Sequence, residues 1–278
     1  MSILAIILAF FGGVFGAAIG AIPAIGLCGF FVLIGSSIMA AGGSADFLNN
    51  VAFGYFFGPH IAFTGAVAAT AYLGSKDNSG FHGTDINKQP FASNDPMALL
   101  VGGIFAVIGY LSAYLITEVL GLKVDGGAIG IVIGSIITRL VFGGGEFMSQ
   151  PEEGQPVFNM STNDLVFGLL WSAAYSAIIS YVTQLTGIPF FGFGFGAFLF
   201  FFTIFGANFP VGHHVGIISA LAMVAFNNYF LAILFGVMAW FVFELVARFF
   251  NTNVKTHIDP PAYAIALFTF ILNTFFIK

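Results

Sequence analysis

Long apolar runs follow one another from end to end of the chain, with short polar segments between them. A run of about 18 or more apolar residues is long enough to cross ~30 Å of hydrocarbon as a helix. The runs do not alternate as spanning strands would. The pattern therefore predicts an all-α polytopic membrane protein with about ten transmembrane helices. The expected spans are residues 2–20, 24–42, 52–73, 96–120, 126–143, 163–184, 189–206, 210–227, 229–250 and 260–277.

Two polar insertions interrupt this pattern. Residues 74–95, GSKDNSGFHGTDINKQPFASND, predict a solvated loop. The second insertion lies near the middle of the chain, and its residues 146–162 read as a polar linker. The linker divides the chain into a first transmembrane repeat, residues 1–145, and a second, residues 163–278.

The two halves carry four similar segments in the same order, which indicates an internal repeat rather than a chance likeness of apolar sequence. Two of the matches contain histidine, so His60 falls opposite His214 and Pro59 falls opposite His213. The matched segments begin at Ile22 and Ile188 (I-P-x-x-G in both), at Gly58 and Gly212 (GPH and GHH), at Leu99 and Ala232, and at Asp125 and Asp259.

Each half holds five expected spans, and an odd number places the second repeat upside down relative to the first. Inverted repeats of this kind bring matched residues together near the midplane, as in secondary transporters. The five-plus-five plan with its I-P-x-x-G elements resembles that of urea-transporter-like channels and other inverted-repeat permeases, and the resemblance implies architecture only. If residues 52–73 and 210–227 both turn back, each repeat has four spans and the repeats become parallel.

The GPH and GHH elements are the strongest candidates for a solute site. Each lies at a Gly/Pro-rich break before a short helical run, residues 61–73 and 215–227, which covers only about 20 Å. Such runs predict broken or re-entrant helices whose positive N-terminal ends lie within the membrane, beside histidines. The alternative is that these histidines lie at the interface or pair with a carbonyl. The predicted substrate-binding residues are Gly58, His60, Thr64, Gly212, His213 and His214.

Four further residues are candidates for coupling or gating. Glu118 and Glu244 lie near the ends of long spans, where charge is costly and often functional, although Glu244 can pair with Arg248 four residues on. Asp259 opens the last span and has His257 two residues before it, so both could gate a shared pocket. Snorkelling to the interface and ordinary helix capping are the alternative roles for these side chains.

Composition excludes several other classes. The 278 residues are 59% hydrophobic and only 7% charged, with a formal net charge of −5, whereas soluble domains carry roughly 25% charged residues. Basic clusters are lacking, so we expect no nucleic-acid partner. A single cysteine and the lack of zinc, nucleophile-elbow and Walker motifs predict no metal, no cofactor and no enzyme. The glycine-rich spans are compatible with a homo-oligomer.

The charge distribution gives an expected orientation, in which five basic residues fall on one side of the membrane and two on the other. Lys76, Lys88, Arg139, Arg248 and Lys255 form the first group, and Lys123 and Lys278 form the second. The first side is then cytoplasmic and both termini are outside, in what we expect to be the inner membrane of a prokaryote. Burial of the two arginines would weaken this count.

These patterns predict a transporter or channel for a small polar solute, with its site between the two repeats. A small anion or weak acid, with proton coupling, is the favoured solute because protonated histidines and helix N-termini attract anions. A passive pore for a neutral solute such as urea or ammonia is the second hypothesis. The third is a membrane subunit that transports nothing and holds a partner complex.

Overall fold

The computed structural model describes residues 2–277, and no strand occurs among them. The prediction of an all-α fold is confirmed. The α-helices are α1 Ile3–Ile19, α2 Ala21–Ala40, α3 Ala62–Gly74, α4 Pro96–Tyr114, α5 Gly126–Phe142, α6 Thr162–Thr186, α7 Phe190–Phe198, α8 Phe200–Thr203, α9 His213–Phe226, α10 Tyr229–Phe250 and α11 Pro260–Phe275. Two π-helical segments, η1 Leu48–Ala52 and η3 Leu115–Val119, and one 3-10 turn, η2 Pro90–Ser93, complete the set.

Four helices in the described part of the chain are long and apolar enough to cross a membrane, and they indicate an integral membrane protein. They are α2, α4 with its continuation η3, α6 and α10. Six further apolar helices have only 10–17 residues. Of the about ten expected transmembrane helices, some of them expected to be broken or re-entrant, four therefore reach full spanning length. Among the shorter helices, α1 ends at Gly20, which has a positive φ of 93°, and α9 ends at Asn227, whose backbone is left-handed.

The expected breaks occur at the GPH and GHH elements. Residues 52–73, predicted as one span, divide into the end of η1, an irregular stretch and α3, which begins three residues after Pro59. Proline cannot donate to a helical carbonyl, and here the carbonyl of Gly58 accepts from the amides of Ile61 and Ala62 at 2.8 and 3.0 Å. In the second half, α9 begins directly at His213.

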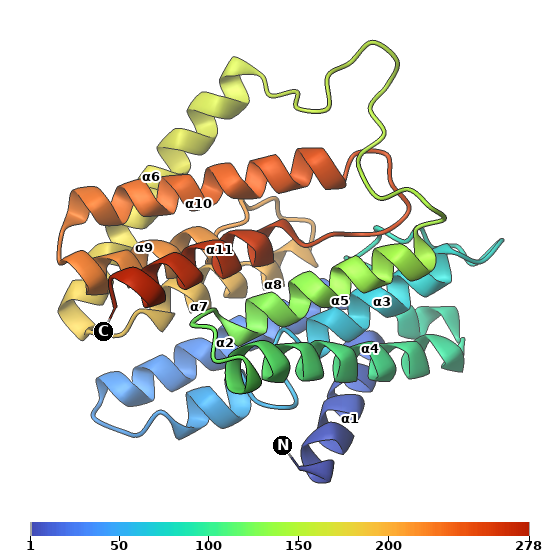
Figure 1. Cartoon of the computed structure of the whole chain (residues 1–278), viewed down its shortest axis with the longest axis horizontal. Helices are drawn as coiled ribbons and strands as arrows, with labels where there is room; N and C mark the ends of the chain where they lie inside the picture. Colours follow the sequence, from blue (N-terminus) through green and yellow to red (C-terminus); the bar gives the residue numbers. More distant parts are fainter. Residues whose placement is uncertain (1, 278) are drawn as a thin grey trace.

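The same helix pairs pack together in each half of the molecule. In the first half α1 packs on α3 and α4, and α4 packs on α5; in the second half α6 packs on α9 and α10, and α10 packs on α11. Between the halves α2 contacts α7 and α5 contacts α11. These two contacts join matched helices, which is the pattern of an interface with two-fold character. Figure 1 shows the two sets of helices meeting along α5 and α11.

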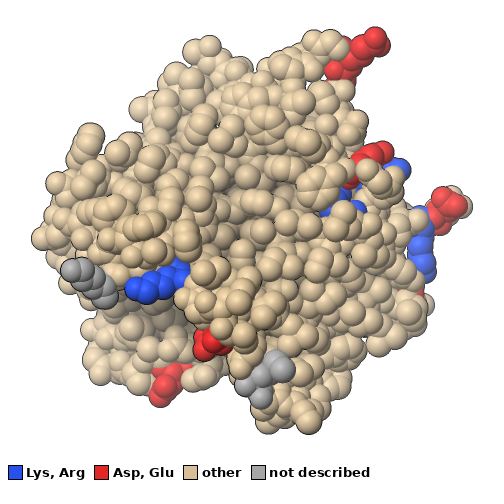
Figure 2. All heavy atoms as spheres, viewed as in Figure 1, with Lys and Arg blue, Asp and Glu red and all other residues tan. Residues whose placement is uncertain are grey.

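The polar connections gather at one end of the molecule. Residues 74–95, 144–161 and 251–259 all lie on the right of Figure 1. Exposed ion pairs link some of them, such as Lys76 with Asp95 at 2.6 Å and Lys255 with Glu146 at 3.6 Å. Figure 2 shows charged atoms at this end, a few at the lower left, and a wide belt without charged atoms between them on this face. Such a belt suits contact with lipid.

Candidate functional site

A cavity of about 440 Å³ lies between the two halves. Its wall contains the first turns of α3, α5, α9 and α11, together with residues of α2, α7 and the loops that precede α3 and α11. The volume is within the range of pockets that hold small molecules. The lining is mostly apolar, and its polar side chains come chiefly from the helix starts.

Matched positions of the two repeats line this cavity together. The match of the GPH and GHH segments and the match of Asp125 with Asp259 each carry several residues into the wall. The cavity therefore lies where the repeats are related to each other, and both contribute to it alike. The lining pairs are Pro59 and His213, Phe63 and Ile217, Asp125 and Asp259, Gly127 and Pro261, Ala128 and Ala262, and Ile131 and Ile265.

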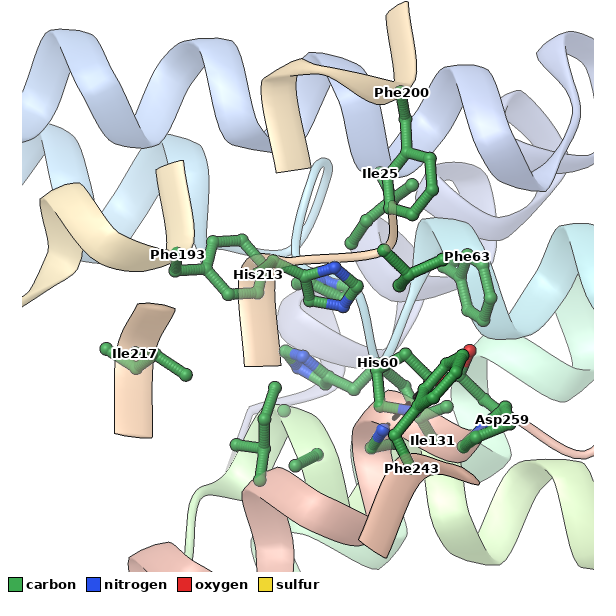
Figure 3. Close-up of a pocket in the computed structure, with 18 of the residues that line it drawn as sticks. Ile25, His60, Phe63, Ile131, Phe193, Phe200, His213, Ile217, Phe243 and Asp259 are labelled. Carbon is green, nitrogen blue, oxygen red and sulfur yellow. Dashed lines mark hydrogen bonds between the residues drawn. The ribbon is translucent and has the colours of Figure 1, made fainter. Parts of the chain in front are cut away.

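Two histidines from different repeats face the cavity (Figure 3). The His213 ring lies edge-on to Phe193 and Phe200, at centroid distances of 5.3 and 5.6 Å. Only 6% of His213 is exposed. Within the described residues the Nδ1 atoms of His60 and His213 are buried and have no hydrogen-bond partner. The two imidazole rings therefore border the space, while their Nδ1 atoms are covered by protein.

His214, the sequence match of His60, is not part of the wall. It is fully buried and its ring stacks on Phe243 of α10 at 4.8 Å, with 18° between the ring planes. In the first repeat the corresponding helix α4 passes His60 with Gly109, whose missing side chain leaves room for the His60 carbonyl. The two histidines thus occupy different surroundings, one beside the cavity and one against the Phe243 ring.

Asp125 and Asp259 bring carboxylates into the cavity from the first residue before α5 and α11. One oxygen of Asp125 accepts from the Ala128 amide at 2.7 Å, and one oxygen of Asp259 accepts from the Ala262 amide at 3.1 Å. Both are N-caps, as the sequence indicated. The other oxygen of Asp259 lies 3.5 Å from Nε2 of His257, which also lines the cavity.

The remaining predicted site residues lie outside this cavity. Thr64 donates to the Pro59 carbonyl at 3.4 Å, and Gly212 is the N-cap of α9, packed against Trp171. Glu118 is exposed in η3. The structure therefore brings together His60, His213, His257 and Asp259 from the predicted set, and places Gly58, Thr64, Glu118, Gly212, His214 and Glu244 elsewhere.

Asp125 was not among the residues predicted for the site, although it lines the cavity. The signal that could have identified it was already present, because Asp125 matches Asp259 and the second was chosen. The apolar wall residues gave no signal of their own. In the sequence, Phe63, Ile131 and Ile265 cannot be distinguished from ordinary core residues, because they line the cavity only where the helix starts converge in the fold.

A buried arginine fixes the loop that leads to α11. Arg139 is 1% exposed and donates from Nε to the Thr256 hydroxyl at 2.5 Å and from Nη2 to the Thr256 carbonyl at 2.6 Å. Its guanidinium also donates to the carbonyls of Phe147 and Phe250 at 2.7 and 2.9 Å. A cation from α5 therefore holds the C-terminal end of α10 and the stretch that carries His257 and Asp259.

The charges of the cavity wall have one sign among the described residues. Two carboxylates line it, and no lysine or arginine does. No group of three His, Cys, Asp or Glu side chains in residues 2–277 is arranged to hold a metal ion. The chemistry that the wall offers is hydrogen-bond acceptance, negative charge and apolar contact.

The duplication seen in the packing is also found by comparison with known families. The model of one family of unknown function, DUF7973, matches the sequence twice, over residues 1–164 and over residues 165–277. Among curated proteins and among solved structures, no significant match was found. Because the two family matches together span nearly the whole sequence, this chain belongs to the family of unknown function DUF7973 and contains two copies of its unit.

Proposed function

We propose that the protein is a membrane transporter or channel for a small polar solute, and that the solute binds in the cavity between the two repeats. The observation that carries this proposal is the wall itself, in which matched residues of both repeats line one space at four helix starts. Secondary transporters bind their solutes at such a repeat interface, beside broken helices.

The proposal includes the finer architecture expected from the sequence, with five helical elements per repeat and opposite orientations in the membrane. α5 runs from left to right in Figure 1 and α11 runs from right to left, and α4 and α10 are likewise opposed. This arrangement supports inverted repeats. The short helices α3 and α9 are then broken or re-entrant elements that begin within the membrane, where irregular backbone is tolerated beside a wet cavity.

A solute path must be reachable from both sides of the membrane, and cysteine labelling tests this without knowledge of the solute. Cys28 is the single native cysteine, so Cys28→Ala gives a background free of thiols. Ile131→Cys and Ile265→Cys then place one thiol in the cavity from each repeat. A charged thiosulfonate reagent that does not cross membranes is applied to oriented vesicles, first outside only and then inside only.

Three control variants calibrate this experiment. Leu170→Cys, at a position 68% exposed on the apolar surface of α6, reports on thiols that face lipid. Ser44→Cys and Asn87→Cys lie in loops at opposite ends of the molecule and report which side is labelled (Figure 1). We expect both cavity thiols to react from either side, at rates that differ between sides, while the Leu170→Cys thiol stays unlabelled.

The outcomes separate the proposal from its rivals. Cavity thiols that react from neither side, or from one side only, would refute a solute path and favour a subunit that holds a partner complex. If both sides react, flux of a bound solute that saturates with concentration indicates a carrier. Flux that rises linearly and ignores pH indicates a passive pore.

A further inference from the structure

We propose that the occupant of the central cavity is a small organic cation, a protonated amine attached to an apolar group. This inference rests on the proposed function, since it names the solute class for the same cavity. Asp125 and Asp259 supply negative charge from two repeats. Each carboxylate uses one oxygen on a backbone amide, at Ala128 and at Ala262, and Asp125 is an exposed residue that lines the cavity.

An anion finds little to bind in this wall. No lysine or arginine lines it in the described chain. Of the four helix starts in the wall, α9 has no side-chain cap, and the amides of the other three are largely used. Those of α5 and α11 hold the two aspartates. At α3 the first amides are paired with backbone carbonyls, those of Ile61 and Ala62 with Gly58 and that of Thr64 with Pro59. The anion or weak acid favoured from the sequence is therefore a poorer fit than a cation.

The histidines add acceptors for N–H groups. His213 is more than nine-tenths buried, and its Nδ1 has no partner among the described residues although the ring borders the cavity. The Nδ1 of His60 is in the same condition. A neutral imidazole can present one unprotonated nitrogen as an acceptor, and Nε2 of each ring, which is not among the covered atoms, is the nitrogen that an ammonium group can reach.

Six phenylalanine side chains complete the wall and suit both parts of such a molecule. Their faces attract a nearby ammonium through the ring quadrupole, and their surface accepts an apolar group. A cavity of about 440 Å³ has room for an amine with a single ring. The six are Phe53, Phe63, Phe190, Phe193, Phe200 and Phe243.

Three probes of one carbon skeleton test the inference: phenethylammonium, 2-phenylethanol and phenylacetate. Each is added at pH 7.5 to the purified full chain, and the shift in unfolding temperature and the Kd by calorimetry are measured. A ligand that binds the native state raises the unfolding temperature. We expect phenethylammonium to stabilise the protein and the other two to have less than a tenth of its affinity.

Two variants place the binding in the cavity. Asp125→Asn and Asp259→Asn each remove one charge yet keep an N-cap, because asparagine caps helices about as well as aspartate. We expect each to weaken phenethylammonium binding tenfold or more. Asp46→Asn, at an exposed loop position, is the matched control and should leave the affinity unchanged.

Each result decides the matter. Equal or tighter binding of the alcohol or the carboxylate would overturn the proposal of a cation, without contradicting a solute site in the cavity. Affinity for phenethylammonium that is unchanged in both cavity variants would overturn it as well. Lack of binding by all three probes would also overturn it. In that case labelling of the cavity thiols from both membrane sides shows whether the proposed function survives or falls with it.

Discussion

Removal of the Arg139 guanidinium should destabilise the protein strongly. In Arg139→Ala, the hydroxyl and carbonyl of Thr256 and the carbonyls of Phe147 and Phe250 all lose the donor described above. The arginine is 1% exposed, so water cannot readily replace the lost contacts. The end of α10 also loses a cation close to its negative dipole end.

The magnitude follows from these contacts. A buried acceptor left unpaired costs about 1–3 kcal/mol, and four of them would sum to about 4–12 kcal/mol. Desolvation of the arginine in the native protein offsets several kcal/mol of this. We therefore expect a loss of about 3–5 kcal/mol, similar to the loss on breaking other buried ionic contacts. For a chain of this size that corresponds to a fall of roughly 6–20 °C in the unfolding temperature.

Tryptophan fluorescence on heating in detergent measures this fall, since the chain has two tryptophans. Lys255→Ala is the control. Lys255 pairs with Glu146 at 3.6 Å with side chains 56% and 34% exposed, and an exposed pair of this kind contributes about 0–1 kcal/mol. If both variants lower the unfolding temperature equally, the buried hydrogen bonds of Arg139 do not carry the stability assigned to them.

Three smaller predictions follow from other contacts. Gly109→Ala should lower the free energy of unfolding by about 1–3 kcal/mol, because the added methyl group meets the backbone before α3. Gly126→Ala is the control and should be neutral, since the nearest atom to its added methyl group lies at 3.4 Å. Equal unfolding temperatures of the two variants would contradict this. His214→Phe should change the free energy of unfolding by less than about 1 kcal/mol, since it removes two unpaired nitrogens. Phenethylammonium should still bind to this variant. Loss of that binding would indicate that His214 takes part in the site. The hydrogen bond from Lys76 lowers the pKa of Asp95, so Lys76→Met should be less stable than wild type above about pH 4. The difference in unfolding temperature between the two proteins should vanish as the pH falls through the lowered pKa. A difference that persists at pH 2 would contradict this prediction.

Much of the fold follows from local sequence. Apolar length predicts the long helices, and glycine with proline predicts the break before α3. The repeat was visible in four short matches. The π-helical segments at residues 48–52 and 115–119 have no such signal, because they depend on how each helix end packs on its neighbours.

The site was predicted less completely, for a physical reason. Its wall is made where residues far apart in sequence converge, and local patterns do not report such contacts. The sequence match pairs His60 with His214, but only His60 faces the cavity, whereas the His214 ring stacks on Phe243 of a helix distant in sequence. The choice of an anion rested on the histidines and the helix N-termini, and local sequence does not show that Asp125 and Asp259 line the same cavity.

The Arg139 clamp bears on how the two copies depend on each other. When the match of Asp125 with Asp259 is extended along the chain, Arg139 corresponds to Asn273 and Thr256 corresponds to Leu122. The clamp is therefore not repeated at the opposite end, because the second copy lacks the cation and the first copy lacks the hydroxyl. Two identical first halves, assembled as a homodimer, would present leucine where the guanidinium needs an acceptor. The halves have become complementary parts, and neither can now stand in for the other.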